Sequence, residues 1–116
     1  MKILSALLLL ALSSIAHATE PTFKKDIRPI LKAKCTKCHG FLVKQKKLDL
    51  RSLKAVLKGG ESGPSVIPGD PAKSPLIAAL SLPKNDIRRM PPAAEKDQLT
   101  PDEITLLNKW VKTGAK

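Results

Sequence analysis

The sequence predicts a small all-α domain in which long irregular loops connect three to four short helices. Several segments carry apolar residues at helical spacing, and no segment shows the period-two alternation of a strand. Six glycines and ten prolines predict the loops. Aromatic residues make up only 3% of the chain, which leaves few large groups to bury. We therefore expect a bound group to complete the core.

Residues 1–18 predict a secretory signal peptide that is cleaved after Ala18. Lys2 precedes an apolar run from Ile3 to Ile15, and Ala16-His17-Ala18 forms a small-x-small cleavage site. The run is shorter than the roughly 20 residues of a membrane span. We expect a soluble periplasmic protein without a transmembrane anchor, monomeric, with one domain over residues 19–116.

The first two helices are expected on either side of the cysteines. Apolar residues recur at helical spacing from about Thr22 to Lys34, and Pro29 should bend this helix or mark its regular start. A second helix is expected from Asp49 to Lys58, because leucines share one face and Gly59-Gly60 provides a stop.

The last two helices have clear start signals. Ser74-Pro75 combines an N-cap with a first-turn proline and opens a short helix to about Leu80. The sequence Thr100-Pro101-Asp102-Glu103 predicts a capping box. The helix that it opens should end near Gly114.

The stretch KCTKCHG, residues 34–40, holds both cysteines and, once the leader is removed, the only histidine. A thioredoxin-like dithiol would need alternating strands and helices, and a zinc site would need a fourth ligand. The third alternative is the C-x-x-C-H haem attachment motif. The thiols of Cys35 and Cys38 would then form thioethers with two porphyrin vinyl groups, and His39 would bind the iron. We expect one covalent haem c per chain, which would also complete the thin core.

Met90 is the expected ligand on the other face of the iron, because it is the only methionine of the mature chain. The alternative is a core methionine that fills a gap, but Met90 lies in the irregular stretch Arg88–Pro92. The two following prolines should stiffen the backbone that carries the sulfur. The ring of His39 is expected to donate its second N–H to a backbone carbonyl after Gly60, at Pro64.

These motifs resemble the planctomycete-type cytochrome c domain, a small class I-like mono-haem cytochrome c. The resemblance implies a cytochrome c-like fold around one haem. It also implies that Cys35 and Cys38 are the thioether anchors, His39 the proximal ligand and Met90 the distal ligand. The matching segments are Phe23 to Leu31, Cys35 to Gly40, Leu48 to Leu50, Gly59 to Pro64, Pro68 to Pro71, Ser74 to Ile77, Met90 to Pro92 and Trp110 to Ala115.

Two protein ligands would leave the iron no open position, and a methionine ligand raises its reduction potential relative to two histidines. The expected function is single-electron transfer between redox partners rather than catalysis. The alternative is a haem peroxidase or a sensor of gaseous ligands in which Met90 is displaced, although the sequence offers no distal histidine.

The chain is strongly basic, with a formal net charge of +11, which becomes +10 when Lys2 is removed with the leader. Simple solubility is one explanation. Export and the scarcity of aromatic residues argue against nucleic acid. The lysines near the motif predict a redox partner that is acidic at its docking face. They are Lys32, Lys34, Lys37, Lys44, Lys46 and Lys47.

Overall fold

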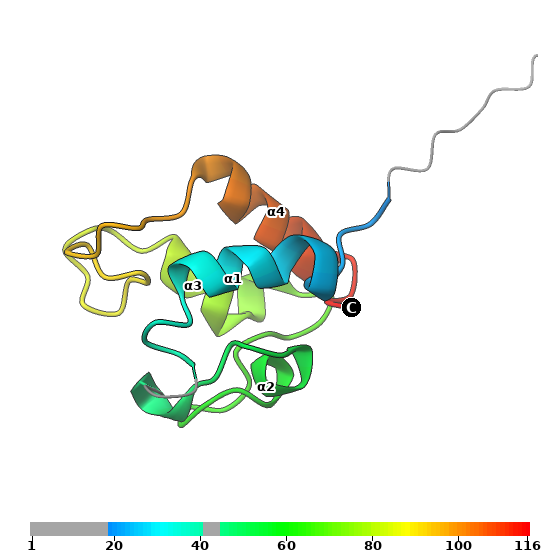
Figure 1. Cartoon of the computed structure of the whole chain (residues 1–116), viewed down its shortest axis with the longest axis horizontal. Coiled ribbons are helices and arrows are strands. Elements are labelled where there is room, and N and C mark those ends of the chain that lie inside the picture. The colour runs from blue at the N-terminus through cyan, green and yellow to red at the C-terminus, as the bar shows by residue number, and fades with distance from the viewer. Residues whose placement is uncertain (1–18, 41–44) are drawn as a thin grey trace, which may run out of the picture.

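The computed structural model describes residues 19–40 and 45–116, and these contain four α-helices, three short helical turns and no strand (Figure 1). The predicted all-α fold is confirmed. The α-helices are α1 (Arg28–Lys34), α2 (Leu53–Lys58), α3 (Pro75–Leu80) and α4 (Pro101–Lys112), and the turns are η1 (Phe23–Ile27), η2 (Gln45–Lys47) and η3 (Pro71–Lys73). The predicted signal peptide lies outside the described residues. Among those residues, no helix is long and apolar enough to cross a membrane.

The first predicted helix consists of two parts with different backbone geometry. Residues Phe23–Ile27 form a π-helical turn, and the regular helix α1 begins at Arg28, with Pro29 in its first turn. A proline ring clashes with the carbonyl four residues earlier, and the wider π turn relieves that clash. The prediction that regular helix starts near Pro29 is therefore confirmed.

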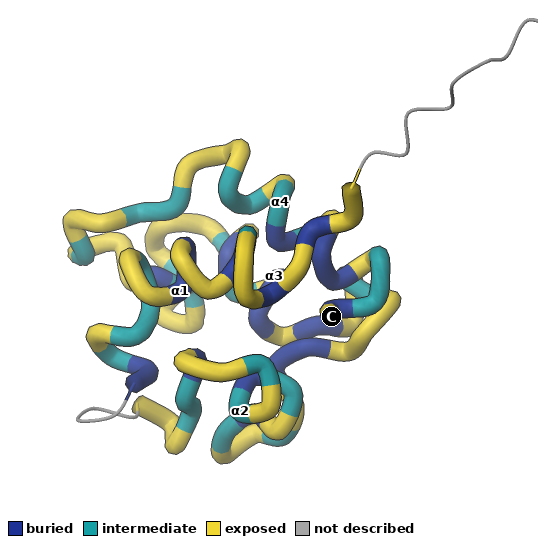
Figure 2. The backbone as a smooth tube through the Cα atoms, turned by 45° about the vertical axis from the view of Figure 1, so that its right-hand side comes forward, coloured by how far each residue is buried: buried dark blue, intermediate teal, exposed yellow. Residues whose placement is uncertain are grey.

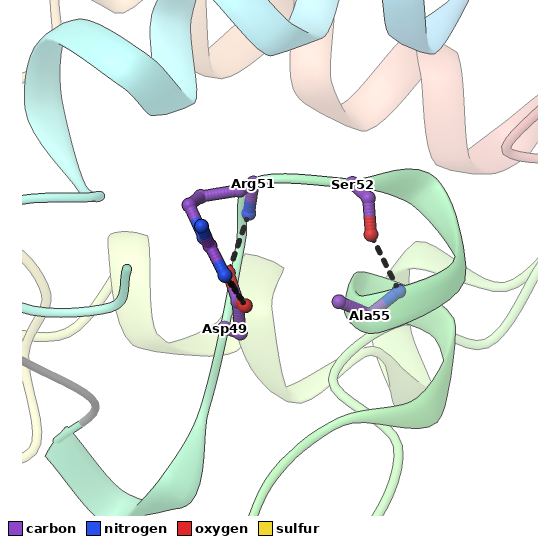
Figure 3. A network of polar contacts seen from close by, with 4 residues as sticks. All are labelled: Asp49, Arg51, Ser52 and Ala55. Carbon is purple, nitrogen blue, oxygen red and sulfur yellow. Dashed lines mark hydrogen bonds and ion pairs between the residues drawn. The ribbon is translucent and has the colours of Figure 1, made fainter. Parts of the chain in front are cut away.

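Helix α2 begins four residues later than predicted, at Leu53 instead of Asp49. The Asp49 carboxylate accepts hydrogen bonds from the backbone N–H and the guanidinium of Arg51, and these contacts hold the stretch outside the helix (Figure 3). Ser52 is the N-cap, with its hydroxyl oxygen 3.1 Å from the amide nitrogen of Ala55. Local bonds of this kind compete with helix formation. Gly59, with φ +76°, ends the helix as predicted.

Helices α3 and α4 have the predicted bounds, but only α4 has the predicted side-chain cap. Thr100 and Glu103 form the capping box, and Gly114 adopts φ +115° after the helix end. Ser74 precedes α3 without capping it. Its buried hydroxyl instead accepts from the N–H of Ile67 and donates to the carbonyl of Asp70. Ser74 therefore stabilises the preceding loop.

The core lies where α4 packs against η1 and α3. The rings of Phe23 and Trp110 have centroids 5.9 Å apart. The carbonyl of Lys116 accepts from the backbone N–H of Phe23 and from the indole Nε1 of Trp110, which joins the two ends of the domain. The buried residues lie mainly in and near these helices, whereas the residues between α3 and α4 are mostly exposed or half-buried (Figure 2).

Candidate functional site

The structure brings all four predicted site residues to one cavity of about 210 Å³. Cys35, Cys38 and His39 reach it from the chain that follows α1, and Met90 reaches it from the segment between α3 and α4. The apolar side chains that line the cavity include Leu48, Leu50, Leu76, Ala79, Leu80 and Pro91. Residues 55 positions apart in the chain, Cys35 and Met90, thus face the same space.

The cysteine motif forms a compact turn at the end of α1. The backbone N–H groups of Cys35 and Thr36 both donate to the carbonyl of Leu31, and those of Cys38 and His39 donate to the carbonyl of Cys35. Gly40 follows this turn so closely that a Cβ there would lie 2.3 Å from the carbonyl oxygen of Thr36. Both the helix end and the glycine therefore fix where the thiols and the imidazole lie.

His39 is 9% exposed, and its ring Nδ1 lies 3.0 Å from the carbonyl oxygen of Gln45. Because a carbonyl can only accept, Nδ1 carries the proton in this contact, and in the neutral tautomer Nε2 has the free lone pair that a metal ligand needs. The prediction that the carbonyl of Pro64 accepts this hydrogen bond is wrong. Turn η2 brings Gln45 to the ring, since the Gln45 N–H donates to the carbonyl of Cys38 at 2.8 Å.

The sequence carries no clear signal for Gln45. Turn η2 depends on positive φ angles at Lys46 and Lys47, residues that do not favour that conformation. Pro64 does lie on the cavity wall, in the loop after Gly60. The prediction therefore identified a loop that borders the site but assigned the hydrogen bond to the wrong loop.

Neither cysteine forms a disulfide, and the two thiols have similar partial burial. Burial raises the pKa of Cys35 to about 11, and the nearby Glu103 carboxylate adds to the shift. Cys35 is therefore a neutral thiol at neutral pH, unlike the low-pKa thiolates of reactive dithiol sites. Within residues 19–40 and 45–116, no group of three or more His, Cys, Asp or Glu side chains is placed to hold a metal ion.

Met90 is half-buried and is attached to α3 through its backbone. Its N–H donates to the carbonyl of Ala79 at 3.0 Å, and the peptide bond to the buried Pro91 is cis. Ala79 and Pro91 also line the cavity. The methionine thus lies at the cavity wall, as its predicted role requires, and its ligation remains a prediction.

The residues around the cavity suit a covalently attached haem. Two unpaired thiols, an imidazole with a free Nε2 and a thioether meet at walls that are mainly apolar. An apolar surround is what a porphyrin needs, and the soft sulfur and nitrogen donors are those that haem iron accepts. Charged residues are also present among the lining residues: Lys34, Lys37, Lys46, Glu61, Glu95 and Asp97.

Comparison with known proteins shows a family match and a structural likeness. The sequence pattern of the family described as planctomycete cytochrome C matches residues 35–94, just over half of the chain. The structure resembles part of hydrazine synthase from Kuenenia stuttgartiensis, with a TM-score of 0.52 and 24% identity over 81% of this chain. This chain covers 16% of that protein's chain, so the likeness concerns the fold of one region. No curated protein sequence matches significantly.

Proposed function

Because this chain belongs to the planctomycete cytochrome C family, we propose that it carries single electrons through one covalently attached haem c with His39 and Met90 as axial ligands. The observation that supports this best is the arrangement of two thiols, one imidazole and one thioether around the same apolar cavity. A bound haem supplies an iron that cycles between the ferric and ferrous states.

Each of the four residues has a distinct role in this proposal. Cys35 and Cys38 anchor the porphyrin through thioethers. His39 binds the iron through Nε2, while Gln45 holds the ring by accepting from Nδ1. Met90 would supply the second protein ligand to the iron, which would leave no position for a substrate.

The same arrangement favours electron transfer over chemistry at the iron. The leucines of the cavity wall, Leu50, Leu76 and Leu80, are each less than 10% exposed and keep water away from the site. With His39 and Met90 both held by the protein, the side chains around a bound haem would rearrange little when its oxidation state changes. Both features suit outer-sphere transfer of one electron.

We also infer that the redox partner is acidic at its docking face. Lys37 and Lys46 line the cavity and are exposed, and the Lys37 side chain is 81% accessible. Such charges accelerate encounter with an acidic protein, and salt screens the attraction. The proposal includes export, with cleavage after Ala18, and action as a monomer in the periplasm.

The test starts with the full-length chain produced in a host that has the cytochrome c maturation machinery. A pyridine haemochrome spectrum should show one covalent haem c per chain. The reduced protein should bind carbon monoxide slowly at neutral pH, and Met90→Ala should bind it rapidly. A colourless product would contradict the haem assignment, and rapid binding by the unaltered protein would contradict methionine ligation and favour a gas sensor.

The charge argument has its own test. Electron transfer to an acidic redox protein should slow as ionic strength rises from about 10 mM to about 1 M, a range over which the Debye length falls from about 30 Å to about 3 Å. The double variant Lys37→Gln/Lys46→Gln should reduce this salt dependence, whereas Lys54→Gln on α2 should not. A rate that is independent of salt would exclude electrostatic steering and leave the haem proposal intact.

A further inference from the structure

The segment that carries Met90 has little packing of its own. From residue 81 to residue 100, only Pro91 is buried, and the segment contains no helix (Figures 1 and 2). In both views it extends away from the helices. Its backbone bonds are mostly short turns, such as those from Asp86 N–H to Pro83 and from Arg89 N–H to Asp86. Something else must hold the methionine in place.

The side chain of Gln98 links both parts of this segment. Its Nε2 donates to the carbonyl of Pro92 at 2.8 Å and to the carbonyl of Glu95 at 2.9 Å. Its Oε1 accepts from Nη2 of Arg89 at 3.4 Å. One amide therefore contacts the residue before Met90 and the chain two residues after it.

The backbone of Gln98 continues the connection to the cysteine side of the cavity. Its carbonyl accepts from Nζ of Lys34 at 2.9 Å, and Lys34 immediately precedes Cys35. Lys34 also lies 3.8 Å from the carboxylate of Glu103 at the start of α4. Gln98 thus joins the Met90 segment to the helix end that carries the first thiol.

Arg89 extends the same network to the start of the segment. Its Nη1 donates to the carbonyl of Leu82 at 3.3 Å, while its Nε is buried and has no partner among the described residues. The two bonds of Arg89, to Leu82 and to Gln98, therefore link the start of the segment to its end on either side of Met90.

We propose that Gln98 and Arg89 form a clamp that positions the sulfur of Met90 against the haem site. The clamp consists of the side-chain bonds from Gln98 to Pro92, Glu95 and Arg89, together with the bond from Arg89 to Leu82. The inference rests on the proposed role of Met90 as an iron ligand. Both residues are positioning residues, because they act through the backbone on either side of Met90.

The clamp predicts how easily Met90 leaves the iron. Since only Pro91 of the segment is fully buried, hydrogen bonds make up a large part of the contacts that oppose opening. Removing the Gln98 side chain should increase the population of molecules with Met90 detached by about tenfold, the effect expected for the net loss of one or two partly exposed hydrogen bonds.

The experiment compares four exported holoproteins: the unaltered chain, Gln98→Ala, Gln98→Glu and Asn85→Ala. Gln98→Ala removes the three side-chain bonds made by Gln98 and leaves only the bond from Arg89 to Leu82. Gln98→Glu keeps an acceptor for Arg89 but removes the donors to Pro92 and Glu95. Asn85 is exposed in the same segment and serves as the matched control.

Carbon monoxide binding to the reduced protein and the near-infrared methionine band of the oxidised protein are the two readouts. Gln98→Ala should bind carbon monoxide about tenfold faster and show a weaker band, with Gln98→Glu intermediate and Asn85→Ala unchanged. The Met90 N–H donates a hydrogen bond to the carbonyl of Ala79. Hydrogen exchange of this amide should be faster in Gln98→Ala, whereas exchange of the amides in α4 should be unchanged. This pattern separates local loosening from loss of the fold.

The outcomes distinguish failure of the clamp from failure of the haem assignment. If Met90→Ala binds carbon monoxide rapidly but Gln98→Ala and Gln98→Glu both match the unaltered protein, the clamp is wrong and the ligand assignment stands. If the unaltered protein already binds carbon monoxide rapidly, both proposals fail. If Gln98→Ala does not fold, an unchanged rate in Gln98→Glu and Arg89→Gln would overturn the clamp.

Discussion

The two walls of the cavity are built in different ways. The cysteine wall follows α1, whose Ile30 and Leu31 are buried, and successive backbone bonds within the motif shape it. The methionine wall belongs to a helix-free segment that is held by side-chain bonds centred on Gln98. One wall is therefore stabilised by its own backbone bonds and the helical core, and the other by side-chain bonds within its segment and one bond to the distant Lys34.

Because of this difference, we expect the two walls to have different roles in binding a haem. In the proposed holoprotein, the cysteine wall would provide covalent anchors on a helical support, which suits permanent attachment. The methionine wall would provide one weak ligand on a segment without a helix of its own. We expect changes in the first wall to alter whether haem is attached, and changes in the second to alter only how the iron is ligated.

The largest expected effect is loss of the covalent anchors. Replacing both cysteines, Cys35→Ala/Cys38→Ala, should abolish covalent attachment, because no other cysteine exists in the chain. Extraction with acidified acetone should then remove all remaining haem, whereas the unaltered protein keeps it. Thr36→Ser within the same turn is the control. Haem that resists extraction in the double variant would contradict the role of the thiols.

The next effect concerns the helical core beneath the cysteine wall. Trp110 has no exposed surface and contacts Phe23, so Trp110→Ala should lower the free energy of unfolding by about 3–5 kcal/mol. Urea denaturation measures this change. Carbon monoxide binding under conditions where the variant stays folded should change less than twofold. A rate that rises with the loss of stability would show that the two walls are not independent.

A smaller effect is expected from the glycine that closes the motif. Gly40→Ala places a Cβ 2.3 Å from the carbonyl oxygen of Thr36, so the turn must shift. We expect a loss of about 1–3 kcal/mol in the free energy of unfolding, typical of overpacking. Gly69→Ala, at φ +85° but with open space around it, provides a control for backbone strain alone. Equal losses in the two variants would contradict the clash.

The smallest effect lies in the methionine segment. Hydrogen bonds from Arg88 lower the pKa of Asp86 to about 2. A carboxyl whose pKa is depressed in the folded state stabilises that state above its unfolded pKa of about 4, and this contribution is lost as pH falls toward 2. Arg88→Ala should raise the pKa of Asp86 toward its ordinary value, as measured by NMR titration. A pKa that stays near 2 would contradict the ion pair.

The sequence predicts the cysteine wall better than the methionine wall because the two depend on interactions of different range. The C-x-x-C-H spacing and the cap of α4 are local patterns: the capping box is confirmed, and the motif forms a hydrogen-bonded turn beside the cavity. Met90 could be predicted only because residues 19–116 contain a single methionine. The bonds around it involve Gln98 and Lys34, which are 64 positions apart and show no periodic pattern.

Two local predictions were wrong for the same physical reason. Helix α2 begins at Leu53 and not at the predicted Asp49, because the Asp49 carboxylate accepts a hydrogen bond from the Arg51 N–H outside the helix. The His39 ring bonds the carbonyl of Gln45 and not that of the predicted Pro64, because a short turn with positive φ angles places the Gln45 carbonyl near the ring. In each case, a specific hydrogen bond overrode a general pattern.

We propose that His39 and Met90 are the two protein ligands of the haem iron. The near-infrared spectrum of the oxidised protein tests this assignment most directly. Sulfur ligation by methionine gives a weak band in this region. We predict that the unaltered protein shows the band at neutral pH and that Met90→Ala loses it while keeping its covalent haem. A spectrum without the band in the unaltered holoprotein, or a band that persists in Met90→Ala, would contradict the account.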